Sequence, residues 1–209
     1  MLYTDLAPIP VHEVNVPEQL VESIAELQPP TIIAVSGFGG SGKSSFATAL
    51  GRRINAPIIG VDAFIIDRTM SQYTRWGFID FDRLEQEVLR PFVEGKSITY
   101  GQFDWAINAI GQRLEVPPAS QLIVEGVGLF RPGLLRYFSL LVWVDCPLEE
   151  AIRRGKQRDR VEYNNPQDHV WDGIWRENDV ECFNEYCPKE IAHFVINNDD
   201  DTSNSITLP

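Results

Sequence analysis

The stretch Thr31-Ile-Ile-Ala-Val-Ser36 is followed directly by Gly37-Phe-Gly-Gly-Ser-Gly42-Lys43-Ser44. The first six residues are mostly apolar and β-branched, and they lie between Pro29-Pro30 and a glycine. This composition predicts a buried strand, because the run is too short for a helix. The next eight residues match the pattern G-x-x-x-x-G-K-[ST] at every fixed position. The sequence therefore predicts a strand, a glycine-rich loop and then a helix.

The loop has the composition of a phosphate-binding site. Its glycines let the backbone curl so that successive N–H groups point inward, and the helix that begins near Lys43 adds the positive end of its dipole. We expect Lys43 to reach the β- and γ-phosphates of ATP or GTP, and the Ser44 hydroxyl to bind Mg²⁺. A turn that merely connects a strand to a helix is the alternative. The predicted nucleotide contacts in the loop are Gly37, Gly39, Gly40, Ser41, Gly42, Lys43, Ser44 and Ser45.

Length and composition indicate one globular domain over residues 1–209. The chain is 44% apolar, which is enough for one sizeable core, and no repeat or low-complexity linker divides it. It has 18 Lys and Arg against 30 Asp and Glu, a net charge of −12. This charge argues against nucleic acid or an anionic membrane as the main partner, although a local basic cluster could bind small anions.

The sequence also predicts a soluble, cytoplasmic protein. It contains no run of 18 apolar residues, and its N-terminus lacks the charged and then apolar pattern of a signal peptide. The three cysteines, Cys146, Cys182 and Cys187, are an odd number, which suits a reducing compartment. Structural thiols are favoured over a zinc site, because no second Cys/His pair has metal-ligand spacing.

Strand and helix patterns alternate along the chain. Further apolar runs, each typical of a strand buried on both faces, occupy residues 58–61, 122–126, 140–145 and 193–197. Helical patterns occupy residues 18–27, 45–54, 80–93, 147–158 and 168–186. This alternation predicts a doubly wound α/β domain. We expect an extended lead-in and a helix over 1–30, a small insertion with two extended arms over about 97–118, and a frayed tail over 198–209.

Three acidic residues end predicted strands, where the ligands of α/β sheets gather: Asp62, Glu125 and Asp145. Phosphoryl transfer to a hydroxyl needs magnesium, a carboxylate that orients or deprotonates the acceptor, and cations over the transferred group. We assign Glu125 to the magnesium shell with Ser44, and Asp62 to the role of base. The alternative for either is a helix cap, and for Asp145 the cap is the favoured interpretation.

A basic cluster follows the fourth of the five predicted strands. Its members are Arg153, Arg154, Lys156, Arg158 and Arg160. We predict that residues 153–167 form a mobile lid over the triphosphate, with Arg154 and Arg158 on one helix face. The alternative is a solvated helix end, where cations suit the dipole.

Aromatic residues are concentrated at residues 73–81 and 100–105. Trp76, Phe103 and Trp105 stand among glycine and polar residues rather than on a helical stripe. They could form a stacking wall for a planar ring, and core packing is an equally good interpretation. No role is assigned to His12, His169 or His193.

The motifs together resemble the uridine kinase family of P-loop kinases, which is allied to phosphoribulokinase. The resemblance extends from Ile32 to Asn198. Besides the glycine loop it rests on Val61-Asp-Ala-Phe64, Ile79-Asp-Phe-Asp-Arg-Leu84, Phe103-Asp104, Ile123-Val-Glu-Gly126 and Arg158-Asp159. The combination in this order is more specific than the loop alone.

The resemblance implies a P-loop NTPase fold with a five-stranded parallel sheet, flanking helices and a small substrate-side insertion. It also implies ATP or GTP as donor and a sugar hydroxyl, such as the 5′-hydroxyl of a nucleoside, as acceptor. Asp62 is similar to the family's catalytic base, Glu125 to its magnesium-linked acid and Arg158 to a lid arginine that acts with Lys43. The substrate side implied is Asp62, Phe64, Trp76, Phe103, Trp105 and Asn108.

This chain departs from the family pattern on the nucleoside side. Asn108 or a neighbour stands where the family has a base-contacting histidine, Arg75-Trp-Gly-Phe78 lacks its ribose-binding aspartate, and Gly155 lies near the position of a lid arginine. We therefore predict an ATP-dependent small-molecule kinase, with a nucleoside as the first acceptor. Pantothenate, nicotinamide riboside or a sugar is the alternative, as is a non-catalytic nucleotide-binding protein. The oligomeric state stays open, with a homo-oligomer as one option.

Overall fold

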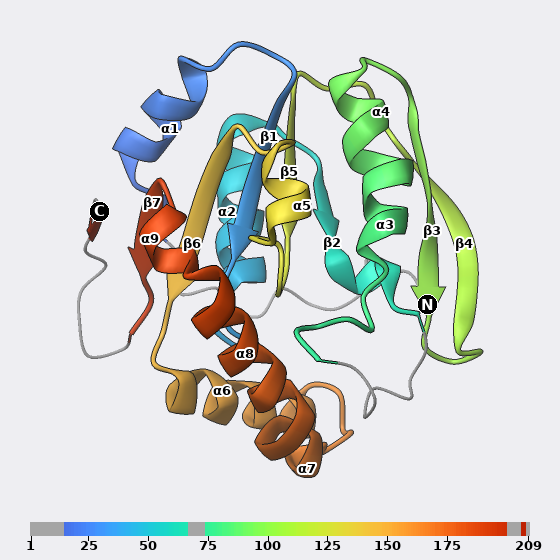
Figure 1. Ribbon diagram of the computed structural model, residues 1–209, viewed down its shortest axis with the longest axis vertical. Coiled ribbons are helices and arrows are strands. Elements are labelled where there is room, and N and C mark those ends of the chain that lie inside the picture. The colour runs from blue at the N-terminus through green and yellow to red at the C-terminus, as the bar shows by residue number, and fades with distance from the viewer. Residues whose placement is uncertain (1–14, 67–73, 200–205, 208–209) are drawn as a thin grey trace.

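The computed structural model describes residues 15–66, 74–199 and 206–207. Its main sheet has the strand order β2-β5-β1-β6-β7-β8, in which the first five strands are parallel and β8 is antiparallel to β7 (Figure 1). The five-stranded parallel sheet predicted from the sequence is confirmed. The strands are β1 Thr31–Ser36, β2 Ile58–Gly60, β5 Gln121–Glu125, β6 Leu140–Asp145, β7 Phe194–Asn197 and β8 Ile206–Thr207.

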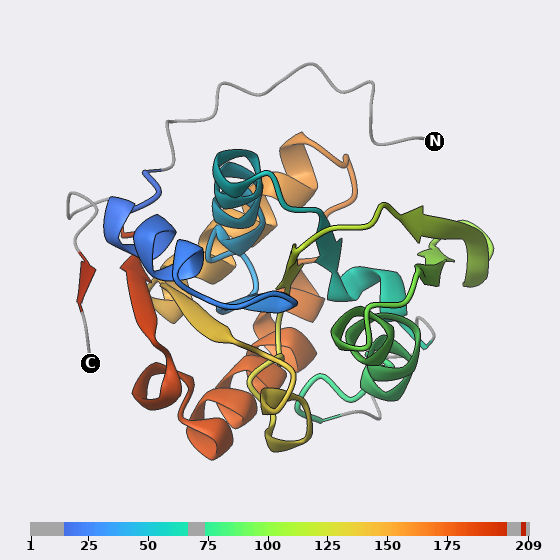
Figure 2. The ribbon, with the colours of Figure 1, turned by 90° about the horizontal axis from the view of Figure 1, so that it is seen from above.

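Helices cover both faces of this sheet (Figure 2). Alternate residues of β1 point to opposite faces, as the two-residue period of a strand requires. Ile33 and Val35 pack with α1 (Glu18–Ala25) and α2 (Lys43–Ile54). Ile32 and Ala34 pack in a second core cluster on the other face. All six residues of β1 are buried, which explains its unbroken apolar run.

The second cluster is covered by the helical segment predicted over 80–93. It consists of α3 (Phe81–Leu84), a π-helical turn η3 (Glu85–Leu89) and α4 (Arg90–Val93). The Asp80 carboxylate accepts a hydrogen bond from the backbone N–H of Arg83 and caps the helix. The expected two-armed insertion is an antiparallel hairpin of β3 (Ile98–Asp104) and β4 (Ala109–Val116), which stands to one side of the main sheet (Figure 1).

The segment after β6 differs in part from the prediction. Helix α6 (Leu148–Val161) extends beyond the expected end, because no residue breaks it before the loop at 162–167. The single helix expected over 168–186 is divided into α7 (Asp168–Val170), the π-helical turn η4 (Trp171–Trp175) and α8 (Arg176–Tyr186). Gly173 causes the division, since its backbone is non-helical with φ −102° and ψ −112°.

One other prediction is wrong. Asp145 does not cap α6, whose N-cap is Pro147 without a side-chain hydrogen bond. Asp145 instead pairs with Lys189 at 2.6 Å. The frayed tail predicted over 198–209 falls mostly on residues 200–205 and 208–209, which lie outside the described part; within the described part, β8 pairs with β7 and Asn198 hydrogen-bonds to the glycine loop.

Three short elements complete the fold: η1 (Val61–Phe64), α5 (Pro132–Leu135) and α9 (Pro188–Ile191). In residues 15–66, 74–199 and 206–207, no helix has the length and apolar character needed to span a membrane. Cys146, Cys182 and Cys187 are free thiols, the first two of them buried.

The contact between Gly155 and Trp171 generates the first prediction. A Cβ at Gly155 would lie 2.3 Å from Cη2 of Trp171, whose indole is buried and hydrogen-bonded to Asp159 and so cannot easily move. Gly155→Ala is therefore expected to destabilise the fold by about 1–3 kcal/mol. Urea unfolding measures this change. The control Gly133→Ala adds a methyl group in open space and should leave stability unchanged or raised by up to about 1 kcal/mol; an equal effect of both variants would contradict the packing argument.

Candidate active site

The carboxyl ends of three neighbouring strands bring the candidate residues together. Strand β5 lies between β1 and β2, with Glu125 in register with Val35 on one side and Gly60 on the other. The phosphate loop follows β1, η1 with Asp62 follows β2, and Glu125 is the last residue of β5. Since parallel strands end at the same edge, the loop, Asp62 and Glu125 share one side of the sheet.

The loop adopts a conformation that its glycines permit. Gly40 and Gly42 have φ of +82° and +91°, in the left-handed region that residues with a side chain avoid. A Cβ at Gly40 would lie 2.1 Å from the carbonyl oxygen of Ala151, at the start of α6. The loop backbone thus packs directly against backbone, and α2 begins at Lys43 as the phosphate-binding mechanism requires.

Lys43, Ser44 and Glu125 form a connected group at the end of the loop. The Ser44 hydroxyl lies 3.2 and 3.1 Å from the two Glu125 carboxylate oxygens. The Lys43 ammonium donates to the carbonyl oxygen of Phe38 at 3.3 Å. Burial raises the pKa of Glu125, the charge of Lys43 opposes this, and that of Asp62 adds to it. Neither Asp62, which is exposed on η1, nor Glu125 caps a helix, so the capping alternative does not describe them.

The donor set fits magnesium. Serine hydroxyl and carboxylate oxygens are the hard ligands that Mg²⁺ prefers, and proteins usually hold it through one or two carboxylates with substrate phosphates and water. In the part of the chain that the structure describes, no three His, Cys, Asp or Glu residues cluster as an all-protein metal site. Ser44 and Glu125 would therefore hold an ion only together with phosphate oxygens and water.

The cations of α6 are paired with acids in this structure. Arg158 lies 3.2 Å from Asp159, its guanidinium is 5.3 Å from the Tyr163 ring, and its positive charge makes a small contribution that lowers the pKa of Glu125. Arg154 donates to Glu150 at 2.7 Å and to the backbone oxygen of Asn198 at 2.8 Å. The other pairs are Arg153 with Glu150, Lys156 with Asp172 and Arg160 with Asp168. The predicted lid is thus a helix with a loop beyond it, and its movement stays a prediction.

Two of the three rings of the predicted aromatic wall, Trp76 and Phe103, are buried. Phe64 and Phe103 are 0% and 2% exposed and belong to the hydrophobic core, as does Trp76 at 5%. Trp105 is exposed, and Asn108 lies beside it in the turn between β3 and β4 with φ of +53°. The three rings of Phe64, Phe103 and Trp76 therefore belong to the hydrophobic core. The residues that cover them come from distant parts of the sequence, so their burial is not visible from their neighbours along the chain.

Sequence reasoning missed two residues that contact the loop. The Asn198 side-chain amide donates to the Ser41 carbonyl at 2.7 Å. The Asp179 carboxylate accepts from the Gly39 N–H at 2.8 Å. For Asp179 a pattern was available, because it falls on the buried face of its helix, four residues after Trp175 and three before Cys182. An acid at such a position needs partners, whereas nothing in the sequence distinguishes Asn198 from its polar neighbours.

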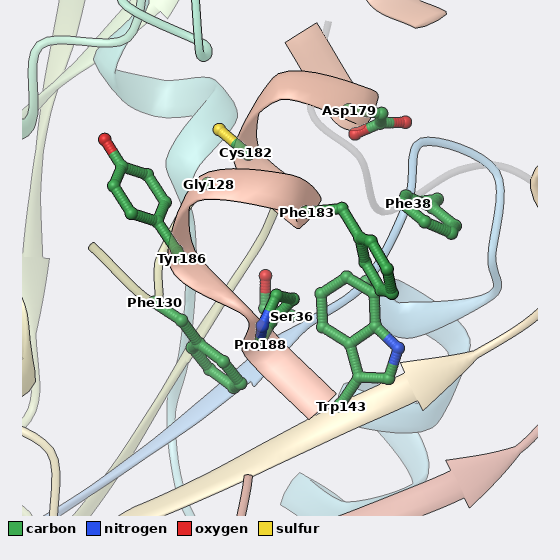
Figure 3. A pocket seen from close by; sticks show the side chains of 11 residues that line it. Ser36, Phe38, Gly128, Phe130, Trp143, Asp179, Cys182, Phe183, Tyr186 and Pro188 are labelled. Atoms are coloured by element: carbon green, nitrogen blue, oxygen red, sulfur yellow. The ribbon is translucent and has the colours of Figure 1, made fainter. Parts of the chain in front are cut away.

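A small cavity lies behind the loop, between the sheet and α8 (Figure 3). Its volume of about 20 Å³ suits a water molecule and excludes a nucleotide or a sugar. Five of its eleven lining residues are aromatic, and Asp179 contributes the charged group. The lining is Ser36, Gly37, Phe38, Gly128, Phe130, Trp143, Asp179, Cys182, Phe183, Tyr186 and Pro188.

Comparison with known proteins adds relatives in sequence and fold. A uridine kinase of Chloroflexus aurantiacus is 28% identical over 145 residues, which cover 64% of this chain and 69% of that protein. A shikimate kinase of Thermus thermophilus is 27% identical over 147 residues, 68% of this chain and 72% of that protein. The structure of a possible uridine kinase from Bacillus stearothermophilus has a TM-score of 0.64 at 18% identity, covering 85% of this chain and 95% of that one. No protein-family model matches the chain.

The loop, the sheet order and these relatives support a small-molecule kinase of the P-loop fold, and the similarity to kinases implies the use of a nucleotide. Within this class the chain is uridine kinase-like, as its motifs predicted.

The environment of Asp179 predicts a dependence of stability on pH. Burial raises the pKa of Asp179 from 3.8 to about 7. Between these values the folded protein binds this proton more tightly than the unfolded chain, so Asp179 should lower the free energy of unfolding as pH rises, by a few kcal/mol in all. Urea unfolding across this range measures the slope. Asp179→Asn should remove this contribution, whereas the exposed Glu177→Gln should keep it; equal slopes in all three proteins would contradict it.

Proposed function

We propose that this protein transfers the γ-phosphoryl group of ATP to a hydroxyl of a small molecule, with a nucleoside such as uridine or cytidine as the first candidate acceptor. The observation that carries the proposal is the position of Asp62, Lys43, Ser44 and Glu125 at the ends of β1, β2 and β5. These are the groups that phosphoryl transfer to an alcohol needs, on the side of the sheet where α/β proteins bind ligands.

The proposed reaction assigns one task to each group. The loop N–H groups and Lys43 bind the β- and γ-phosphates and offset their charge. Ser44 and Glu125 would hold magnesium, which when bound neutralises charge on the phosphate oxygens. Asp62 accepts the proton of the acceptor hydroxyl as its oxygen bonds to the γ-phosphorus and the bond to ADP breaks. Arg158 approaches the transferred group from α6.

The exposure of Asp62 supports its role as base, because an acceptor must reach the carboxylate from solvent. Burial of Glu125, in contrast, suits a group that stays behind the phosphates. The Lys43 charge favours the ionised form of Glu125, which a magnesium ligand requires.

The acceptor is the open part of the proposal. Similarity to a uridine kinase favours a nucleoside, while similar identity to a shikimate kinase favours testing other alcohols. The buried Phe64 and Phe103 are poor candidates for a stacking surface, which leaves Trp105 and Asn108 at the hairpin turn. The proposed substrate side is therefore Asp62 with the hairpin turn.

A coupled ADP-release assay tests the function. Purified protein with ATP and Mg²⁺ is offered uridine, cytidine, shikimate, pantothenate, nicotinamide riboside and simple sugars. Release that depends on one of these compounds identifies the acceptor class. Binding of Mg·ATP with no release across the panel would favour the alternative of a non-catalytic nucleotide-binding protein.

Asp62→Asn is expected to retain Mg·ATP binding and to lower the rate of transfer by about 10²–10⁴-fold, since an amide cannot accept the proton. Binding is measured by calorimetry and transfer by the coupled assay. Asp82→Asn removes an exposed carboxylate of α3 and serves as the matched control, with activity near that of the unsubstituted protein. Near-normal transfer by the Asp62 variant would remove this residue from the mechanism.

A further inference from the structure

One carboxylate joins the phosphate loop to the segment that precedes α3. Asp179 Oδ2 accepts from the backbone N–H of Gly39 at 2.8 Å, and Asp179 Oδ1 accepts from Nε1 of Trp76 at 3.0 Å. The two partners lie 140 and 103 residues away along the chain. Asp179 is 5% exposed and borders the cavity behind the loop (Figure 3). Because the carboxylate is buried and each of its oxygens accepts a hydrogen bond from a separate donor, this contact is part of the interior of the fold and differs from an exposed ion pair.

The Trp76 segment depends on α8 for its conformation. Arg75 and Trp76 have φ of +50° and +58°, a left-handed backbone that costs free energy in residues with side chains. Their backbone N–H groups donate to the side chains of Glu181 and Asn178, respectively. Helix α8 therefore holds this segment through its backbone as well as through the Trp76 indole.

The Gly39 side of the loop is closely covered. A Cβ at Gly39 would lie 3.1 Å from Cζ3 of Trp171 and 3.5 Å from Oδ2 of Asp179. Trp171 is itself fixed, because its Nε1 donates to the buried Asp159 at 2.7 Å. Gly39 thus has little freedom to move, and the Asp179 hydrogen bond sets the direction of its N–H.

Lys43 and Cys182 are the other titratable groups that interact with Asp179. Lys43, on the loop side, favours its ionised form. Cys182, one turn along α8, is a buried thiol whose pKa burial raises to about 12, so it stays neutral throughout the pH range in which Asp179 titrates.

We propose that ionised Asp179 is a positioning residue, which holds the phosphate loop and the Trp76 segment in the arrangement that binds Mg·ATP. The proposal rests on the proposed kinase function and deepens it, because it names the contact that ties the nucleotide side of the site to the segment leading into α3.

The chemistry of the two contacts explains why charge matters. An ionised carboxylate offers an acceptor on each oxygen, so both donors are satisfied. A protonated carboxyl or an asparagine has one carbonyl oxygen, and its other end carries hydrogen and faces a donor. Either change breaks one of the two contacts. Asp179→Asn therefore imitates the protonated protein at every pH.

The test is the pH dependence of Mg·ATP binding, measured by calorimetry from about pH 5.5 to about pH 8.5. The unsubstituted protein should lose about tenfold in affinity as pH falls through about 7, where Asp179 gains its proton. Asp179→Asn should bind about tenfold more weakly at high pH and lack this transition. Glu177→Gln removes one charge from an exposed position on the same helix and leaves Asp179 in place, so it should keep this transition. Any pH dependence that remains in Asp179→Asn records the titration of the nucleotide itself.

Trp76→Phe keeps a ring in place and removes one donor, which makes the proposal testable even if the Asp179 variant fails to fold. The Trp76 contact lowers the pKa of Asp179, so its loss should move the binding transition to higher pH. If Asp179 only stabilised the fold, the affinity for Mg·ATP would fall as pH rises, as the stability does. The positioning role predicts that the affinity rises with pH.

The outcomes are distinct. A transition shared by the unsubstituted protein, Glu177→Gln and Asp179→Asn would overturn the positioning role and leave the kinase proposal intact. Tighter binding by Asp179→Asn at high pH would also overturn it, since the carboxylate would then repel phosphate. Absence of Mg·ATP binding in the unsubstituted protein would overturn both proposals.

Discussion

The phosphate loop depends on backbone contacts that leave no room for side chains. A Cβ at Gly37 would lie 2.7 Å from the carbonyl oxygen of Val144, and one at Gly40 would lie 2.1 Å from that of Ala151. Both oxygens belong to the β6 and α6 region, so the loop is built against the element that carries the arginine cluster. These glycines therefore allow β6 and α6 to pack directly against the loop backbone.

Local groups, rather than the charge of the whole chain, decide whether this site can bind a triphosphate. The net charge of −12 opposes an anion, but exposed charges beyond about 10 Å are largely screened. At the loop itself, the positive end of α2 and the Lys43 ammonium supply positive charge. Burial raises the pKa of Glu125 and of Asp179, and the positive charge of Lys43 opposes this rise for both acids.

The features that were predicted correctly from the sequence are those that depend on residues close together along the chain. Strands of the parallel sheet are buried on both faces, so their apolar runs are visible without knowledge of their partners. The position of Glu125 and Asp62 on one side of the sheet was predicted because strand ends of such sheets meet at one edge. Asp145 was misjudged because its partner, Lys189, comes from a helix 44 residues away along the chain. The bond between Asp179 and Gly39 was missed for the same reason, since partner choice over 140 residues is a property of packing.

Packing also accounts for the departure from the family pattern at Gly155. The Trp171 ring occupies the place where any side chain at this position would begin, with Cη2 at 2.3 Å from the Cβ site. A residue larger than glycine at position 155 would therefore clash with a tryptophan at position 171. Trp171 also covers Gly39, so the ring fills space between α6 and the loop that a lid arginine would otherwise enter. An aromatic contact thus joins α6 to the phosphate loop, and the guanidinium of Arg158, on the next turn of α6, lies 5.9 Å from the Trp171 ring.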